Sequence, residues 1–429
     1  MTHHNDSRIR SETGRPRPDL QPHDLIDLPV RGGWCWFQDE RAIVDAGKLI
    51  FGSVASPEGD VNVTTYDFAA RRAVTVPLHE RLESDDHDAP ALLKSGDGRY
   101  LAAYAAHGAD NLMRWRISLE PGDATRWGPE QSLDVGDRVT YANLYRLSAE
   151  NDGRGRIYNL HRGVGFNPNY LISDDDGRTF RYGGRLFDWP RDPARRGSGR
   201  PYVRYASDGV ETIHFITTED HPLHFANGIY HGFIRGGGVH RSDGTDLGPL
   251  STTMSTTLKP TDLTCIFRGD ERNVAWTVDL RLDSHGKPYA AFSVRDESKR
   301  LHYYYARWDG HAWRAKRMSH AGTALYAAEG DYSGLAALDP SNPEVMYIST
   351  NADPHSGAPL PRREIFEGVT RDGGASWGWR ALTSDSNQDN IRPIAREAGR
   401  DRTILLWLRG TYRTYTDYDL GVVGTLLSR

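Results

Sequence analysis

Apolar residues recur along the chain as pairs of short runs, each pair joined by a turn rich in Asp, Gly or Asn. Apolar runs of this length are typical of strands, and the turn residues are those of hairpins. No stretch has the 3.6-residue period of a long amphipathic helix, which argues against an α/β fold. Seven copies of this strand-turn-strand unit lie at residues 41–54, 90–104, 141–158, 201–216, 276–292, 335–348 and 393–407.

The spacing of these units predicts a ring of seven blades. Successive units begin 50 to 75 residues apart, and the widest gap holds an insertion around residues 234–262. A four-stranded propeller blade takes roughly 40–50 residues. Only 39 residues follow the last start, near residue 390, so the last blade needs a strand from the N-terminal region. We therefore predict an all-β fold, a seven-bladed β-propeller with ring closure between N- and C-terminal strands.

A second motif supports this fold. The segments Ser173–Phe180 and Thr370–Trp377 both match S/T-x-D-x-G-x-T/S-aromatic, which is the Asp-box. In this turn the Asp and Ser/Thr side chains bond turn amides, and the Gly takes a positive φ. We assign both copies to structure and not to function. Residues 1–30 are polar and Pro-rich and are predicted to be a loose arm, and residues 31–429 a single catalytic propeller domain.

Composition and charge argue against several classes of protein. The 429 residues carry a net charge of −5, so no positive excess points to nucleic acid. No apolar run reaches the roughly 20 residues that cross a bilayer. The N-terminus has no apolar core of a signal peptide, so we expect a cytoplasmic protein, or a secreted one if the chain is already processed. Cys35 and Cys265 are too few for a disulfide framework, and we expect both to be buried in a monomer.

Propeller geometry converts the repeat into a predicted site. The innermost strand of a blade and the next strand are antiparallel, so the start of the first and the end of the second lie on one rim. The residues at these positions are rich in His and Arg. The candidates are His87, His107, Tyr141, Arg162, Arg200, His221 and Arg392.

This rim suits an anionic ligand, because Arg makes bidentate contacts to a carboxylate. Ordinary glycoside hydrolysis needs two carboxyl groups at a set spacing, and carboxylates do not dominate here. β-Elimination on a uronic acid instead needs a group that neutralises the carboxylate, a base for the C5 proton and an acid for the departing O4. A His base and a Tyr acid could supply the proton transfers without a redox cofactor.

Three segments, with the Asp-boxes, resemble the BNR-repeat propeller lyases, which include ulvan lyases and L-rhamnose-α-1,4-D-glucuronate lyases. The segments are Trp34–Arg41, Asp86–Leu92 and Val139–Asn143, and the resemblance runs from about Gly32 onward. It implies that His87 and Tyr141 carry the proton transfers and that His107 and Arg162 neutralise the uronate carboxylate. Which of His87 and Tyr141 is the base stays open. Arg200, His221 and Arg392 are expected to bind substrate.

The resemblance implies a lyase that cleaves the bond at O4 of a uronic acid and leaves a 4,5-unsaturated uronate. The preferred linkage is rhamnosyl-α-1,4-glucuronate, followed by the ulvan type, in an oligo- or polysaccharide. We expect exo-type action on short chains if the enzyme is intracellular. No cofactor and no catalytic metal is expected. Some relatives carry a structural calcium, although no Asp-rich loop here singles out a site for it.

Two other functions stay open. Related propellers include α-L-rhamnosidases, which are glycoside hydrolases acting on the same linkage. A non-catalytic carbohydrate-binding propeller could use the same rim. Sialidases also carry Asp-boxes, but their early Arg-Ile-Pro motif is absent from this sequence.

Overall fold

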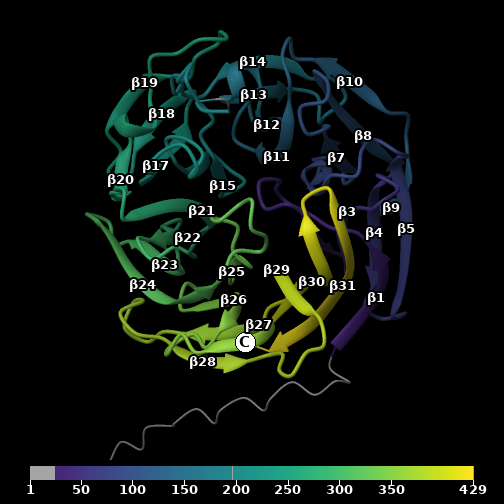
Figure 1. Cartoon of the computed structure of the whole chain (residues 1–429). Coiled ribbons are helices and arrows are strands. Elements are labelled where there is room, and N and C mark those ends of the chain that lie inside the picture. The colour runs from purple at the N-terminus through teal and green to yellow at the C-terminus, as the bar shows by residue number, and fades with distance from the viewer. Residues whose placement is uncertain (1–24, 196, 429) are drawn as a thin grey trace, which may run out of the picture.

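Seven antiparallel sheets surround a central axis in the computed structural model, which describes residues 25–195 and 197–428 (Figure 1). Each sheet is one blade, and blades follow one another around the ring in chain order. Each of the seven predicted strand-turn-strand units forms the two inner strands of one blade. The prediction of a seven-bladed β-propeller is therefore confirmed.

The first four blades span residues 42–267. Blade 1 comprises β2 (Ala42–Asp45), β3 (Lys48–Val54), β4 (Val61–Asp67) and β5 (Arg72–His79). Blade 2 comprises β6 (Ala91–Lys94), β7 (Tyr100–Tyr104), β8 (Leu112–Glu120), β9 (Asp123–Trp127) and β10 (Gln131–Asp134). Blade 3 comprises β11 (Thr140–Leu147), β12 (Arg156–Arg162), β13 (Pro168–Ser173) and β14 (Arg181–Arg185). Blade 4 comprises β15 (Val203–Ser207), β16 (Thr212–Thr217), β17 (Ile229–Arg235), β18 (Gly238–Arg241), β19 (Asp246–Pro249) and β20 (Thr264–Phe267).

The last three blades complete the ring. Blade 5 comprises β21 (Asn273–Leu282), β22 (Pro288–Asp296), β23 (Leu301–Trp308) and β24 (Trp313–Gly322). Blade 6 comprises β25 (Ala336–Leu338), β26 (Val345–Ala352), β27 (Pro359–Val369) and β28 (Gly378–Ala381). Blade 7 comprises β29 (Asp389–Glu397), β30 (Arg402–Thr414), β31 (Asp417–Ser428) and β1 (Leu25–Arg31). Within the described residues, three short 3₁₀ turns lie in the connections: η2 (Asp86–Asp88), η3 (Val164–Phe166) and η4 (Pro260–Asp262).

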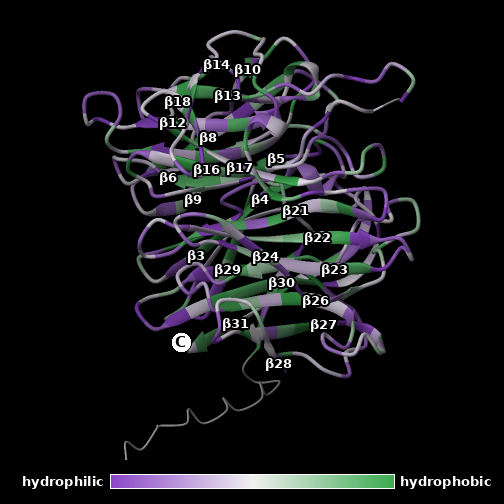
Figure 2. Ribbon diagram, turned by 90° about the vertical axis from the view of Figure 1, so that its left-hand side faces the viewer, coloured by the Kyte–Doolittle hydropathy of each residue, from purple (hydrophilic) through white to green (hydrophobic). Residues whose placement is uncertain are grey.

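Burial follows the position of a strand within its blade. The inner strands β7 and β16 are buried along their whole length, because neighbouring blades cover both of their faces. The outermost strand β5 consists of exposed and half-buried residues apart from the buried Leu78. In Figure 2 the strands carry most of the apolar residues and the loops most of the polar ones. None of the helical segments described is long and apolar enough to cross a membrane.

The ring closes through β1, which pairs with β31 of the last blade. Leu25 lies opposite Thr425 and Leu28 opposite Val422 in this antiparallel ladder. Leu28 and Val30 are buried against the blade. The predicted closure is confirmed, but the predicted end of the arm at residue 30 falls inside this strand. Residues 1–24 of the predicted arm lie outside the described part of the chain.

The predicted insertion lengthens blade 4. It forms the hairpin β18–β19, and β17 pairs with β18 along one half and with β20 along the other. Cys265 lies on β20 and is exposed, whereas Cys35 is buried. The expectation that both cysteines are buried was wrong for Cys265, because β20 lies at the outer edge of its sheet.

Both Asp-boxes form the predicted turns between the two outer strands of a blade. In the first, Asp175 accepts bonds from the backbone N–H and the hydroxyl of Thr179, at 2.9 and 2.7 Å. Gly177, at φ 84°, donates its N–H to the Ser173 hydroxyl. The second box repeats these bonds around Asp372. The Phe180 ring packs edge-on against Trp115, which ties the turn to blade 2.

The segment between β1 and β2 enters the centre of the ring (Figure 1). Trp36 donates from Nε1 to the carbonyl of Thr277 in blade 5. Asp39 is fully buried and pairs with Arg204 of blade 4, which also reaches Asp279 of blade 5 at 3.1 Å. This segment therefore links several blades and fills the channel beneath the predicted rim.

Candidate active site

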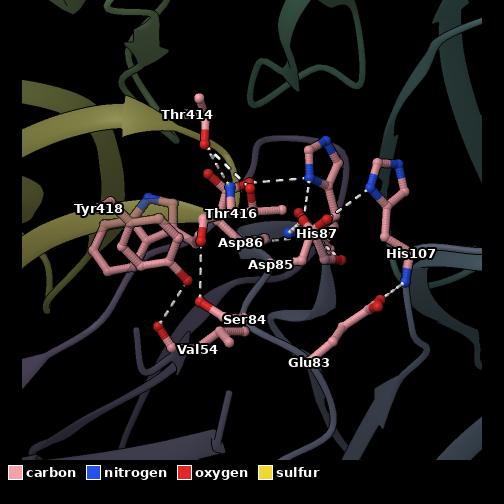
Figure 3. A network of polar contacts seen from close by, with 12 residues as sticks. Val54, Glu83, Ser84, Asp85, Asp86, His87, His107, Thr414, Thr416 and Tyr418 are labelled. Carbon is pink, nitrogen blue, oxygen red and sulfur yellow. Dashed lines mark hydrogen bonds and ion pairs between the residues drawn. The ribbon is translucent and has the colours of Figure 1, made fainter. Parts of the chain in front are cut away.

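A stacked pair of histidines occupies the predicted rim in blade 2. His87 lies in η2, just before β6, and His107 follows the end of β7. Their rings are parallel, with centroids 4.0 Å apart, and Asp85 binds both (Figure 3). Nδ1 of His87 lies 2.6 Å from one carboxylate oxygen, and Nδ1 of His107 lies 2.9 Å from the other. Because each Nδ1 faces Asp85, each Nε2 is directed away from it.

The two histidines differ in charge. Burial lowers the pKa of His87, but the neighbouring acidic groups, Cys35 and then Asp85, outweigh burial and hold that pKa well above its usual value. Burial and the adjacent charge of His87 lower the pKa of His107 to about 4. Burial opposes ionisation of Asp85, yet both histidines hold its pKa below the usual value. At neutral pH the pair therefore carries one positive charge, on His87, while His107 is neutral, beside an ionised Asp85.

Tyr141 and Arg162 extend the site into blade 3. Tyr141 sits at φ 65° in a bulge at the start of β11, which directs its ring towards His87, at 5.6 Å between centroids. The Arg162 guanidinium lies over the Tyr141 ring and within 3.2 Å of His107 Nε2. Its other hydrogen bond goes to the hydroxyl of Tyr202, at 3.1 Å. Among the described residues no carboxylate lies within ion-pair distance of Arg162.

Arg392 supports the site from below. Its side chain is fully buried and binds the carbonyl of Trp34, the carboxylate of Asp86 and the hydroxyl of Tyr412. Asp86 belongs to the same turn as His87, so this ion pair holds the turn in place. The geometry gives Arg392 a positioning role, and its burial argues against the direct substrate contact that the sequence predicted.

A second wall faces the histidine pair. His221 follows β16 in blade 4, and its Nε2 lies 3.7 Å from the carboxylate of Glu329. Glu329 lies in the loop before β25. Arg200 lies just before β15, and its backbone N–H donates to the Asp220 carboxylate at 3.1 Å. Burial raises the pKa of Glu329 to about 7, against the opposing charge of Arg200. Within the described residues Arg200, like Arg162, has no carboxylate within ion-pair distance.

Aromatic rings form the floor between the two walls. Tyr202 contacts both Trp276 and His221, at centroid distances of 5.1 and 5.3 Å. The Tyr332 hydroxyl reaches Nε2 of His87 at 3.5 Å. Tyr415, in the turn between β30 and β31, sets its ring edge-on to His87. The site is therefore apolar at its base and polar on two sides, which suits a sugar with one charged group.

In the part of the chain that the structure describes, two groups of side chains could hold a metal ion. They are Asp85 with His87 and His107, and Cys35 with Asp86 and His87. Nitrogen and sulfur ligands suit zinc-like ions, whereas calcium takes oxygen ligands. The donor atoms of the first group already bind one another through hydrogen bonds. The expectation of a structural calcium stays a prediction.

The structure brings most of the predicted residues together. Direct contacts join His87, His107, Tyr141 and Arg162, and His221 joins through Tyr202. The sequence reasoning missed Asp85, Glu329, Tyr332 and Tyr415. Tyr332 lies at the start of the sixth unit, where the rim rule that selected His87 would also have found it. Tyr415 lies in an outer hairpin to which that rule does not apply.

The fold and the site define a β-propeller with a cluster of His, Tyr and Arg side chains at one rim. The family model that describes BNR repeat-containing family members matches residues 50–321. The chain therefore belongs to the BNR repeat-containing family. No curated protein matches this sequence.

Solved structures share the fold at low sequence identity. A family PL25 polysaccharide lyase, an ulvan lyase bound to -[GlcA(1-4)Rha3S]-, aligns with a TM-score of 0.67 and 15% identity. That alignment covers 93% of this chain and 94% of the lyase. Polysaccharide lyase Uly1 aligns with a TM-score of 0.58 and 11% identity, over 91% of this chain and 90% of the other. These similarities concern the whole propeller.

Proposed function

We propose that this protein is a carbohydrate lyase that cleaves the bond at O4 of a uronic acid by β-elimination. The observation that carries the proposal is the guanidinium of Arg162, which is buried next to His107 and Tyr141 and has no carboxylate partner among the described residues. A buried cation of this kind requires an anion. The carboxylate of a uronic acid would supply it.

Neutralisation of the carboxylate is the first requirement, because the C5 proton is acidic only when the adjacent charge is balanced. Arg162 can form a bidentate contact with that carboxylate. The positive charge shared by the histidine pair adds to the neutralisation. In this arrangement C5 and O4 would lie near His87, His107 and Tyr141.

The proton transfers follow from the protonation states. The pair carries one positive charge, so one of its two imidazoles can accept the C5 proton, and the pKa directions favour His107, the neutral ring. Burial holds the pKa of Tyr141 above its usual value in spite of Arg162, so its phenol keeps a proton to donate to O4. The electrons of the C5–H bond form the C4–C5 double bond, and those of the C4–O4 bond leave with O4. Water is not consumed.

The substrate class has two sources of support. The PL25 ulvan lyase that shares this fold was solved with -[GlcA(1-4)Rha3S]-. The cationic groups of this site, His87 and Arg162, suit such a uronic acid. We propose rhamnosyl-α-1,4-glucuronate as the preferred linkage and the ulvan type as the second.

The test is incubation with gum arabic, ulvan and their oligosaccharides while ultraviolet absorbance of the 4,5-unsaturated uronate is followed. His87→Ala should lower kcat on the order of 1,000-fold and leave substrate binding within a few fold. His285→Ala changes an exposed histidine in a turn at the opposite end of blade 5 and should leave both unchanged.

Other outcomes would contradict the lyase. Release of rhamnose without the absorbance, with oxygen from water in the product, would indicate a hydrolase. Binding without turnover in the wild-type protein would indicate a carbohydrate-binding propeller. Comparison of His107→Ala with His87→Ala shows which imidazole is the base. Only the variant that lacks the base should lose the increase of rate with pH.

A further inference from the structure

The second wall of the site, made of Arg200, His221 and Glu329, has no role in the proton transfers above. The Glu329 carboxylate is mostly buried, and one of its oxygens lacks a hydrogen-bond partner. His221 accepts the N–H of Leu223 at Nδ1, so the neutral ring carries its proton on Nε2, which faces Glu329 at 3.7 Å. A carboxylate and an N–H donor are thus presented side by side.

The position of this wall relative to Tyr141 suggests which sugar it meets. Tyr141 packs against His87 and also against Tyr202, whose ring centroid lies 6.5 Å from its own. Tyr202 leads to His221 and from there to Glu329. Because Tyr141 donates to O4 in the proposed reaction, the sugar attached through O4 lies on the Tyr202 side.

We propose that Arg200, His221 and Glu329 form a subsite for the sugar attached through O4, and that Glu329 selects an uncharged sugar over a sulfated one. This inference rests on the proposed lyase function. Carboxylate and guanidinium groups together bind the hydroxyls of a neutral sugar, as acceptor and donors. A sulfate placed there would meet the charge of Glu329, which offsets the attraction of Arg200.

The charges around Glu329 support this balance. The groups that act on its carboxyl are Arg200, Asp331 and His87, with the neutral His221 in contact. Burial raises the pKa of Glu329 to about 7, so the carboxyl is ionised at pH 8. At pH 8 the second wall therefore carries one positive charge, on Arg200, and one negative charge, on Glu329. The wall that holds the histidine pair and Arg162 is cationic.

The experiment compares kcat/KM at pH 8 for matched oligosaccharides with unsulfated and 3-sulfated rhamnose on O4 of glucuronate. The wild-type protein should prefer the unsulfated substrate. Glu329→Gln keeps the shape of the side chain and removes its charge, and the preference should fall about tenfold. Glu329→Gln should raise kcat/KM for the sulfated substrate, and the double variant that also carries Arg200→Gln should lose this increase. Glu344→Gln, the same change at an exposed residue between β25 and β26, should leave the preference unchanged.

The outcomes separate the two proposals. If the wild-type protein releases no unsaturated product from either substrate, the lyase function is wrong. If it is active but Glu329→Gln keeps the same preference, only the subsite is wrong. Thermal unfolding checks that Glu329→Gln is folded, and Glu329→Ala repeats the test should that variant be unstable.

Discussion

At the scale of single residues, the site depends on how one carboxylate distributes protons. Asp85 bonds both histidines and also caps η2 by accepting the backbone N–H of His87 at 2.9 Å. It is thus both the group that orients the rings and the charge that favours a proton on the pair. The dual role of Asp85 is missed when only His87 is considered in this sequence motif.

Asp85→Asn should lower kcat on the order of 100-fold, because the two imidazoles lose their common orientation. Removal of the negative charge also lowers the pKa of His87, so the pair should lose its proton at a lower pH than in the wild-type protein. The pH–rate profile and the NMR titration of the ring protons measure this shift. Asp97→Asn, in a turn at the opposite end of blade 2, is the control. An unchanged profile in Asp85→Asn would contradict the role of Asp85.

At the scale of elements, the Asp-boxes illustrate a motif that serves the fold and not the chemistry. Both turns repeat the same set of bonds between outer strands. Their rings pack between blades, as Phe180 does against Trp115 and Trp377 against Tyr305. Among the described residues, the hydrogen bonds and ring contacts of these turns involve none of the side chains at the rim.

Phe180→Ala should therefore destabilise the protein by about 3 kcal/mol, as expected for loss of a buried aromatic ring. kcat and KM should stay at their wild-type values at temperatures where the variant is folded. Urea unfolding measures the first effect, and the lyase assay the second. A loss of kcat without a loss of stability would show that the Asp-box acts on the site.

At the scale of the whole molecule, the ring buries several histidines in their neutral form. Burial lowers the pKa of both His161 and His214 to about 4. His214 also lies 3.1 Å from His231, a distance at which two charged rings would repel each other. Neutral histidines inside the blades are thus part of the packed state.

The free energy of unfolding should fall as the pH decreases from about 6.5 towards 4. Above the unfolded-state pKa, near 6.5, both states are neutral; below it the unfolded chain binds protons that the folded protein binds only near pH 4. Urea unfolding at pH 8, 6 and 5 measures the decrease. In His214→Phe the free energy of unfolding should fall less between pH 8 and pH 5 than it does in the wild-type protein. An equal decrease in both proteins would contradict a contribution from His214.

The architecture could be predicted from the sequence because propeller blades are local. Each blade folds from consecutive strands joined by short turns, so hydrophobic pairs and Asp, Gly and Asn turns identified all seven units. The rim rule then selected His87, His107, Tyr141 and Arg162, since antiparallel strands place a start and an end on the same side. The end of the arm was misplaced, because β1 is recognisable as a strand only through its pairing with β31.

What the sequence determined by itself was the periodic pattern and the types of residue at one rim, both of which depend on neighbours in the chain. The tertiary structure alone decided which of these side chains are exposed to a ligand. Arg392 and Arg200 occupy similar rim positions, but Asp86 takes up the charge of Arg392 and no described carboxylate pairs with Arg200. Glu329, likewise, meets His221 only when blades 4 and 6 close around the axis. Protonation and pairing arise from groups far apart in the chain, because electrostatic interactions depend on distance in space.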